Sequence, residues 1–238
     1  MIQFFAPDIE KDLSLPPEES SHCCKVLRKR VGEIISVTDG RGGRYSCEII
    51  SDSPKKTEVR IIEKIEVPKG WRGEIVLAVA PTKNADRMSW LVEKSVEIGV
   101  DKIIFVDCLR NERHKLSVER LRRVAVSAMK QSLKARLPEI SEMISLSQFM
   151  DLPFSGLKVF GYCDDASPRL EFTSIYKPDS GVCILIGPEG DFSAGEVETL
   201  RCKGFSAVTF GDMRLRTETA AFYGLTAVHV IDSMTQCQ

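Results

Sequence analysis

Five short apolar runs alternate with longer segments of helical periodicity after residue 73. These runs lack the polar alternation of a strand with one face in water, so each is expected to be a strand buried on both faces. Such strands with helices between them are typical of a parallel sheet covered by helices, an α/β fold. The predicted strands are 74–80, 102–107, 157–162, 181–187 and 206–211, and the predicted helices are 84–100, 117–135, 193–203 and 217–231.

Two of the predicted helices carry recognisable end signals. Asn84 precedes one helix as an N-cap, and Gly99 follows its last turn. Ser193 and Glu196 have the spacing of a capping box, and Gly204 lies beyond the end of that helix. These signals predict where two strand–helix connections begin and end.

Residues 1–68 follow a different pattern and predict a small β-domain, a barrel with one early helix. The helix is expected to open at Pro17, where a proline and two acids form a favourable first turn, and to run to residue 30. Asp39-Gly40 and Gly42-Gly43 lie between two alternating runs and predict a hairpin.

Bulk composition sets the scale of the protein. Its 238 residues allow two modest domains, and the linker "PKGWRG" predicts domains at 1–68 and 73–238. With 43% hydrophobic and 28% charged residues, the chain has the composition of an ordinary soluble protein. No apolar run approaches the roughly 20 residues that span a bilayer, and the start has no secretory signal pattern. We therefore expect a cytoplasmic protein without a membrane partner.

Cysteine and histidine usage argues against a metal centre. The chain has eight cysteines without a CxxC pair, and only three histidines. Zinc sites require closely spaced ligands of these types, so we expect no metal and mostly reduced thiols.

Positive charge is concentrated although the formal net charge is only −1. The predicted helix after residue 117 carries basic residues at three- and four-residue steps, which places them on one face. Like charges repel unless an anion neutralises them, so this pattern favours contact with an RNA backbone, although a solvated helix face is the alternative. The predicted RNA-binding residues are Lys25, Arg28, Arg30, Arg44, Arg120, Arg123, Lys130 and Lys134.

Two glycine-containing loops follow predicted strands near the C-terminus. They read "IGPEGDF" at 186–192 and "FGDMRLRTETA" at 210–220. Neither matches the dinucleotide-binding or P-loop patterns, which disfavours those phosphate sites. Pro188 has no N–H and Glu189 is acidic, so the first loop suits a neutral or cationic ligand.

Four segments in order resemble a known family: "KNADRMSWLVEKSVEIGV", "MKQSLKARLPEI", "LIGPEGDFS" and "RLRTETAA". The chain is similar to the bacterial SPOUT methyltransferases that methylate N3 of a uridine in 16S ribosomal RNA. Its N-terminal part resembles their PUA-like RNA-binding barrel, so nearly the whole chain is covered. The resemblance implies a trefoil-knotted C-terminal domain, S-adenosyl-L-methionine as cofactor, 16S ribosomal RNA within the small subunit as partner, and a homodimer.

The resemblance also implies where the cofactor is held. In this family it sits among the ends of three strands, which correspond here to 160–165, 185–190 and 210–218. Glycines there let the backbone approach the cofactor; a plain turn before a helix is the alternative for each glycine alone, and the two loops together favour the cofactor. The predicted cofactor-binding residues are Tyr162, Ile186, Gly187, Pro188, Gly190, Phe210, Gly211, Leu215, Arg216 and Thr217.

Uracil N3 carries a proton that must leave before the nitrogen attacks a methyl group, so a base or a nearby cation is required. Glu218 and Glu189 are the candidate bases, and Arg216 is the candidate cation. Glu218 alternatively stabilises the start of the last helix through its charge. That apolar helix is a candidate for the dimer face, with core packing as the alternative.

The sequence departs from the family pattern in three places. Gln131 to Lys134 replaces Gln-Ser-Gly-Arg, Met213 to Arg216 replaces Arg-Ile-Leu-Arg, and Asp191 stands where a third glycine is common. Two other functions stay open: a non-catalytic RNA-binding or ribosome-assembly factor, and a SPOUT methyltransferase acting on another RNA position.

Overall fold

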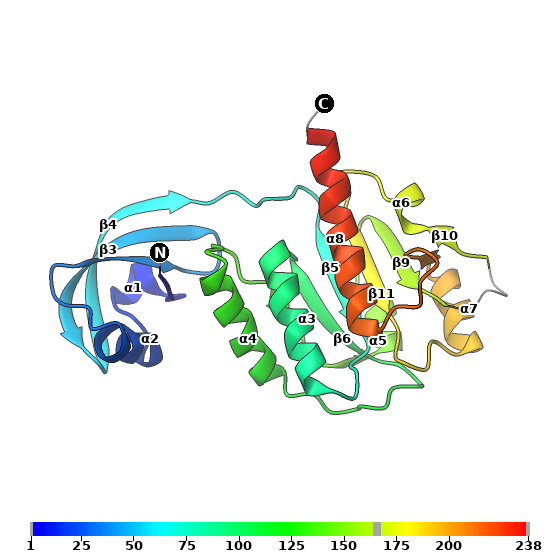
Figure 1. Ribbon diagram of the computed structural model, residues 1–238, viewed down its shortest axis with the longest axis horizontal. Coiled ribbons are helices and arrows are strands. Elements are labelled where there is room, and N and C mark those ends of the chain that lie inside the picture. The colour runs from blue at the N-terminus through cyan, green and yellow to red at the C-terminus, as the bar shows by residue number, and fades with distance from the viewer. Residues whose placement is uncertain (1, 164–167, 237–238) are drawn as a thin grey trace. The chain divides into compact units, whose positions relative to one another are not determined.

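The computed structural model describes residues 2–163 and 168–236, which form two compact units (Figure 1). One unit contains Met1–Gly70 together with Val126–Leu137, and the other contains Trp71–Ala125 together with Pro138–Gln238. Helix α4 (Val118–Gln131) contributes residues to both. Nothing in the sequence of 126–137 indicated that this segment packs with the N-terminal unit.

The first unit is built on a four-stranded sheet. Its strands are β1 (Gln3–Phe5), β2 (Ile34–Thr38), β3 (Gly43–Ser53) and β4 (Lys56–Glu66), in that order across the sheet. β1 is parallel to β2, and the remaining neighbours are antiparallel. Thr38 faces Arg44 at the end of the β2–β3 hairpin, which confirms the hairpin prediction. Gly40 and Gly42 lie in its turn with φ values of 74° and 119°, a backbone conformation that favours glycine.

The early helical region is shorter than predicted. After α1 (Ile9–Asp12), helix α2 (Pro17–Ser21) opens at Pro17 as expected and continues as the single π-turn η1 (His22–Val26). The prediction of a helix through residue 30 is wrong, because Arg28 adopts a left-handed φ of 55°. Its candidate RNA-binding side chains therefore lie partly on a loop.

The second unit contains a parallel sheet, as predicted. Its central order is β10-β12-β9-β11-β5-β6-β7, and β8 also pairs with β6. Every pairing in this sheet is parallel. The strands are β5 (Ile75–Val79), β6 (Lys102–Asp107), β7 (Glu139–Ile140), β8 (Ile144–Ser145), β9 (Leu157–Gly161), β10 (Leu170–Glu171), β11 (Val182–Ile186) and β12 (Ser206–Thr209).

Helices cover both faces of this sheet. Helices α3 (Ala85–Ile98) and α8 (Thr217–Gln236) pack together, and α8 lies on β5 and β11. Helices α5 (Leu146–Met150) and α7 (Ala194–Cys202) join the cluster on the opposite face, and α6 (Phe172–Ile175) follows β10.

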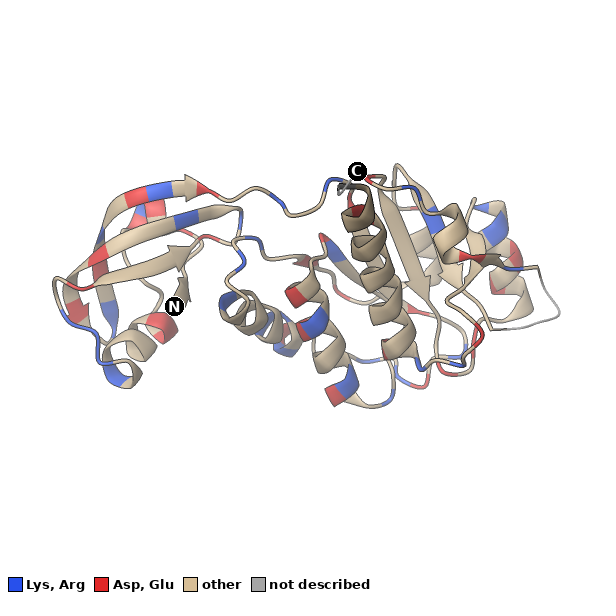
Figure 2. Cartoon of the chain, turned by 45° about the horizontal axis from the view of Figure 1, so that its top comes forward, with Lys and Arg blue, Asp and Glu red and all other residues tan. Residues whose placement is uncertain are grey.

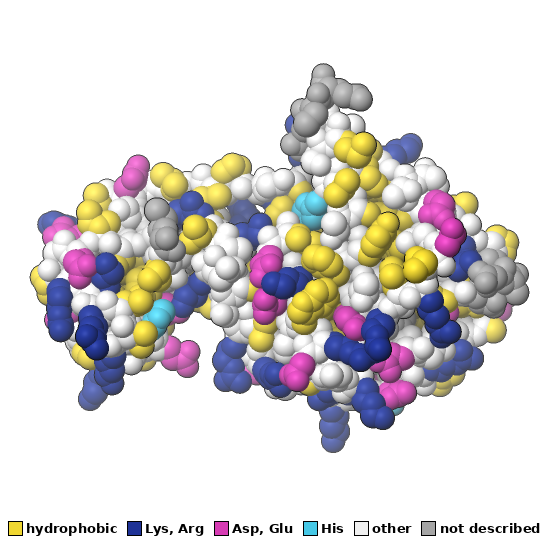
Figure 3. All heavy atoms as spheres, viewed as in Figure 1, with side chains coloured by type: hydrophobic (Ala, Val, Ile, Leu, Met, Phe, Trp, Pro, Cys, Tyr) yellow, Lys and Arg dark blue, Asp and Glu magenta, His cyan; other side chains and the backbone are white. Residues whose placement is uncertain are grey.

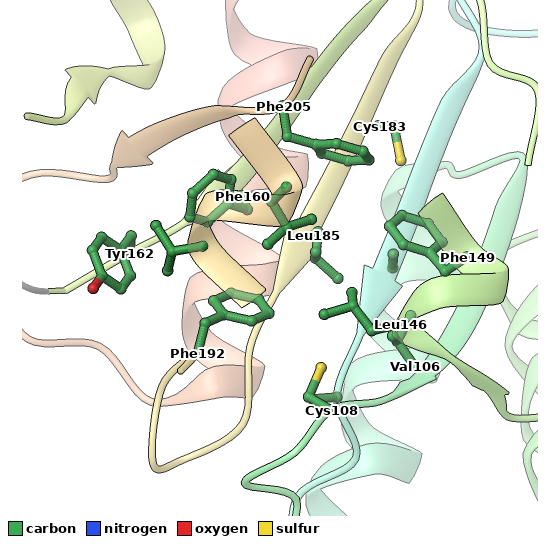
Figure 4. Close-up of a cluster of buried hydrophobic side chains, with 14 of the residues drawn as sticks. Val106, Cys108, Leu146, Phe149, Phe160, Tyr162, Cys183, Leu185, Phe192 and Phe205 are labelled. Atoms are coloured by element: carbon green, nitrogen blue, oxygen red, sulfur yellow. The ribbon is translucent and has the colours of Figure 1, made fainter. Parts of the chain in front are cut away.

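The strand side chains alternate between these two layers. Leu185 belongs to the cluster with α5 and α7, whereas Ile184 approaches Gly224 of α8. Figure 4 shows Leu185 among Phe149, Phe160 and Phe192. Because both faces are covered, the central strands β5 and β11 are apolar and buried at every position, which explains their runs in the sequence. None of the helices in the described part of the chain is long and apolar enough to cross a membrane.

Both predicted capping arrangements are confirmed. The Asn84 side chain accepts a hydrogen bond from the Asp86 amide, and Ser193 and Glu196 form a complete capping box. By contrast, α4 ends at Gln131 rather than at residue 135, because Leu133 takes a left-handed φ of 54°. The prediction that Lys134 shares the basic face of this helix is therefore wrong.

Candidate active site

Three loops meet at one edge of the parallel sheet. Strands β12, β9 and β11 are neighbours and run in the same direction, so the loops that follow them lie together at their carboxyl ends. This edge is the usual place for ligands in open α/β sheets. The loops contain the predicted cofactor-binding residues. Positions 164 and 165 of the first predicted strand end lie outside the described residues.

A buried hydrogen bond joins two of these loops. The Thr217 hydroxyl donates to the carbonyl oxygen of Gly187 at 3.2 Å. Thr217 is the first residue of α8, and Gly187 directly follows β11. The bond therefore links the two glycine-containing loops, which are 30 residues apart in sequence.

Asp191 links the third loop to the same assembly. Its Oδ2 accepts a hydrogen bond from the Cys163 amide at 3.1 Å, and its Oδ1 accepts one from the Phe192 amide at 2.8 Å. Asp191 has a φ of 58°, a conformation in which glycine is common. The sequence shows that the family's third glycine is missing here, but it carries no signal of this link.

The two glycines of the first loop have different surroundings. A Cβ atom on Gly187 would lie 2.7 Å from the Phe192 ring, closer than real contacts allow. A Cβ atom on Gly190 would lie 3.5 Å from Arg110 Cβ, an ordinary contact. Packing inside the protein thus already requires glycine at position 187 and does not require it at position 190.

Some of the remaining predicted cofactor-binding residues are buried in the core, and others lie in the exposed part of the loops. Tyr162 is 9% exposed, and its ring lies 5.9 Å from that of Phe160 within the cluster of Figure 4. The Phe210 ring packs against Phe172 at 5.5 Å. Ile186 and Pro188 are buried, Leu215 is half-buried, and Gly211 is exposed with a φ of 96°.

Arg87 connects the two candidate bases, although nothing in the sequence pattern distinguishes it as a site residue. Its Nη1 lies 3.4 Å from Glu189 Oε1, and its Nε lies 3.5 Å from Glu218 Oε1. Glu218 is 7% exposed, whereas Glu189 is exposed. The second oxygen of Glu218, Oε2, is buried and has no hydrogen-bond partner among the described residues.

Arg216 lies directly before α8 and is exposed. Its side chain makes no ion pair with the described residues, in contrast to that of Arg87. The guanidinium is therefore available to a ligand at this edge of the sheet.

The candidate RNA-binding residues of the first unit differ in how far their charges are engaged. Lys25, Arg28 and Arg30 are exposed, and Arg30 pairs with Asp52 at 3.3 Å. Arg44, in contrast, donates to the Leu133 carbonyl oxygen. These observations favour the loop and π-turn residues over Arg44 as contacts for an external anion.

The two lysines near the end of α4 also interact within this unit. The Lys130 ammonium pairs with Glu19, and the side chains are 20% and 13% exposed. Lys134 is half-buried, and this burial lowers the pKa of its ammonium. Neither lysine is as accessible as the sequence pattern indicated.

The candidate RNA-binding residues of the second unit, Arg120 and Arg123, lie on α4, and further basic residues such as Arg110 lie on the loop before it; Figure 2 draws all lysines and arginines in blue. Arg120 forms an exposed pair with Asp86 at 2.9 Å, and Arg123 is exposed. Arg110 donates to the Gly190 carbonyl oxygen at 2.9 Å. The loop before α4 is therefore attached to the loop that follows β11.

Comparison with known proteins agrees with a methyltransferase site. Residues 69–229 match the RNA methyltransferase domain family, and residues 15–62 match the RNA methyltransferase PUA domain family. The first match covers well over half of the chain, so this protein belongs to the RNA methyltransferase family. Its fold is that of the SPOUT-type methyltransferases with a PUA-like N-terminal domain.

Individual relatives are similar over nearly their full length. A probable rRNA methyltransferase from Porphyromonas gingivalis is 40% identical, with 99% of this chain and 100% of that chain covered and a TM-score of 0.94. A methyltransferase from Legionella pneumophila, solved with bound S-adenosylmethionine, is 26% identical with 97% of each chain covered and a TM-score of 0.86. The ribosomal RNA small subunit methyltransferase E of Bacillus subtilis is 26% identical, over 90% of this chain and 88% of the relative.

Proposed function

We propose that this protein transfers a methyl group from S-adenosyl-L-methionine to N3 of a uridine in 16S ribosomal RNA. The observation that carries the proposal is the linked set of three strand-end loops, which Thr217–Gly187 and Asp191–Cys163 hydrogen bonds hold together. The names of the related small-subunit methyltransferases support the RNA substrate. The trefoil knot of the family is part of this proposal.

The residues at these loops fit S-adenosylmethionine. Backbone amides and carbonyls of the loops, with Ile186 and Leu215 beside them, suit an adenine ring. Glu189 and Glu218 supply negative charge for a sulfonium, and the unpartnered oxygen of Glu218 is an acceptor within the site. When bound, the cofactor supplies an electrophilic methyl group.

The chain's own residues must then prepare the nucleobase. Glu218 is the stronger candidate base, because its buried oxygen lacks a donor while Glu189 is exposed. Arg216 is placed to stabilise negative charge at a uracil oxygen. Because base pairing uses N3, the target uridine has to be unpaired or turned out of its stack.

RNA contact is assigned to both proposed domains, 1–68 and 73–238. The exposed cations Lys25, Arg28, Arg120 and Arg123 are the proposed phosphate contacts, and Arg30 contributes despite its pair with Asp52. Phosphate contacts fix the position of an RNA, while the site at the sheet edge selects the base. An assembled small subunit as substrate implies a cytoplasmic location.

We also propose a homodimer formed through α3 and α8. Hydrophobic side chains gather over these helices in Figure 3. Trp90 is 41% exposed, Tyr223 48% and Val230 49%, which is unusual for large apolar side chains unless a partner covers them. V230E should convert a dimer to a monomer in light scattering, whereas L152E, at a similarly exposed leucine outside these helices, should not. A wild-type monomer at micromolar concentration would contradict the dimer.

Nucleoside mass spectrometry tests the activity. Small subunits from cells lacking the protein should lose 3-methyluridine from 16S ribosomal RNA, and the purified protein with S-adenosylmethionine should restore it. Methylation of a ribose 2′-oxygen would instead give a normal base and resistance to alkaline cleavage. Failure to bind S-adenosylmethionine in calorimetry would favour the non-catalytic assembly factor.

A further inference from the structure

Arg87 occupies a central position among the acidic groups of the site. It lies in the first turn of α3 and is about one third exposed, with a side-chain exposure of 32%. One nitrogen faces Glu189 of the loop after β11, and another faces Glu218 in the first turn of α8. The guanidinium therefore contacts two segments that enclose the proposed cofactor site.

The surroundings of Glu218 show why this contact matters. A buried carboxylate is costly unless a positive group or hydrogen-bond donors compensate for the lost hydration. Arg87 compensates at Oε1 only, and Oε2 has no donor among the described residues. The helix dipole also stabilises carboxylates that are exposed to water, so the dipole alone does not account for the burial of Glu218.

Glu189 has a different relationship with Arg87. Its side chain is 39% exposed, so water solvates it and its ion pair contributes little energy. It restrains the guanidinium from the outer side, at 3.4 Å from Nη1. Arg87 thus has two different partners: Glu189, which is exposed to water, and Glu218, which is buried.

We propose that Arg87 is a positioning residue that acts through Glu218: it holds Oε1 and leaves Oε2 to accept the N–H of the target base. This inference rests on the proposed methyl transfer. In that step the N3 proton goes to Oε2, and the electron pair on N3 forms the bond to the methyl carbon. The S–CH₃ bond breaks with its electron pair remaining on sulfur, and the protonated carboxyl then loses its proton to water.

A double-mutant cycle tests this role, because residues that act as one unit have non-additive effects. Single-turnover methylation of small subunits, with enzyme in excess, is measured for R87Q, E218Q, E189Q and the two double variants. R87Q should lower the rate about 10- to 100-fold, as loss of a catalytic alignment does. R87Q/E218Q should be no slower than E218Q, whereas R87Q/E189Q should be as slow as R87Q.

Two variants separate positioning from folding. R87K keeps the positive charge and should recover at least part of the rate, because a lysine still neutralises Oε1. R72Q removes an arginine from the exposed pair with Asp179, before β5 in the same unit, and should leave the rate unchanged. Calorimetry should show that R87Q still binds S-adenosylmethionine, and the rate is measured at saturating S-adenosylmethionine, so that the loss lies in the methyl-transfer step and not in cofactor binding.

The possible failures are distinguishable. Additive losses in R87Q/E218Q, or a rate loss that disappears in the E189Q background, would overturn the role through Glu218. If R87Q does not fold, an R87K variant that is slower than wild type and that slows E218Q by the same factor in R87K/E218Q would overturn it instead. A wild-type protein that leaves uridine N3 unmethylated would overturn the proposed function itself, whereas an active wild type with an additive cycle overturns only the role of Arg87.

Discussion

The Thr217 hydroxyl and the Gly187 carbonyl oxygen, 3.2 Å apart, join the start of the last helix to the end of a central strand. Both residues are buried. Because the predicted cofactor-binding residues lie on either side of this bond, it fixes the distance between the two loops that carry them.

Replacing Thr217 with valine should therefore loosen the site. T217V keeps the shape of the side chain but removes the donor, and leaves the buried Gly187 carbonyl oxygen without this partner. We expect a loss of about 1–3 kcal/mol in the free energy of unfolding. Affinity for S-adenosylmethionine should fall about 5- to 10-fold, as about 1 kcal/mol implies. T217S retains the hydroxyl and is the matched control in calorimetry; equal affinities for T217S and T217V would contradict the role of the bond.

The two glycines of the loop after β11 provide a matched pair of substitutions. G187A places a methyl group 2.7 Å from the Phe192 ring and should cost about 1–3 kcal/mol of stability, as overpacking does. G190A meets only Arg110 at 3.5 Å and should leave the melting temperature close to that of wild type.

The smaller side chain in G187A/F192L should recover part of the loss caused by G187A. If G190A instead abolished S-adenosylmethionine binding while the melting temperature stayed unchanged, position 190 would need to be glycine for the cofactor, as the family resemblance implies. Thermal unfolding and calorimetry on the same samples separate these outcomes.

The sequence predicted the connections whose signals are local. The N-cap at Asn84 and the capping box at Ser193 involve residues two and three positions apart, so residue type and spacing identify them. Arg87 could not be found in this way. It is one charged residue on an amphipathic helix, and its pairing with Glu189 spans 102 residues. That contact depends on the order of strands in the sheet, which periodicity does not determine.

Helix ends at residues other than glycine were also missed. Arg28 and Leu133 both adopt left-handed φ values, 55° and 54°, although neither residue type favours them. At Leu133 the tertiary structure accounts for the conformation: the chain after it pairs with the N-terminal unit, where the Gly42 amide donates to the Ala135 carbonyl oxygen at 2.8 Å. Such long-range pairing overrides the local preference and has no signal in the segment itself.

Tyr45 gives the N-terminal unit a defined response to alkaline pH. Burial, and the negative charge of Asp39, raise the pKa of this phenol to about 12, and its hydroxyl donates to Asp39 Oδ2 at 3.2 Å. The unfolded chain loses the phenolic proton near pH 10. Between these values the folded state binds more protons, so its stability decreases as pH rises.

Y45F removes this titrating group. At pH 7 the variant should be less stable by about 1 kcal/mol, because one hydrogen bond is lost. Above pH 10 the difference between wild type and Y45F should shrink. Ionisation of the Tyr45 phenol then stabilises the unfolded state of wild type, and Y45F has no such group at this position. Urea unfolding at pH 7, 9 and 10.5 measures the difference, and a constant difference across this range would show that Tyr45 does not titrate as stated.

The basic residues of α4 should separate into RNA contacts and internal ion pairs. R123A removes an exposed charge and should weaken binding to small-subunit RNA, with the slope of log affinity against log salt reduced by about 1. K203A, which removes another exposed cation of the same unit, is the control and should leave the slope unchanged.

K130A should act on folding instead. The substitution leaves the Glu19 carboxylate without its partner, in a pair whose side chains are only 20% and 13% exposed. We therefore expect a loss of about 1–3 kcal/mol in the free energy of unfolding, with little change in the salt slope. K130M/E19Q removes both charges and should recover part of that stability, because no unpaired carboxylate remains. A reduced salt slope in K130A at wild-type stability would show that Lys130 leaves Glu19 to contact a phosphate, as the sequence pattern predicted, and would place the RNA-binding surface further along α4 than Arg123.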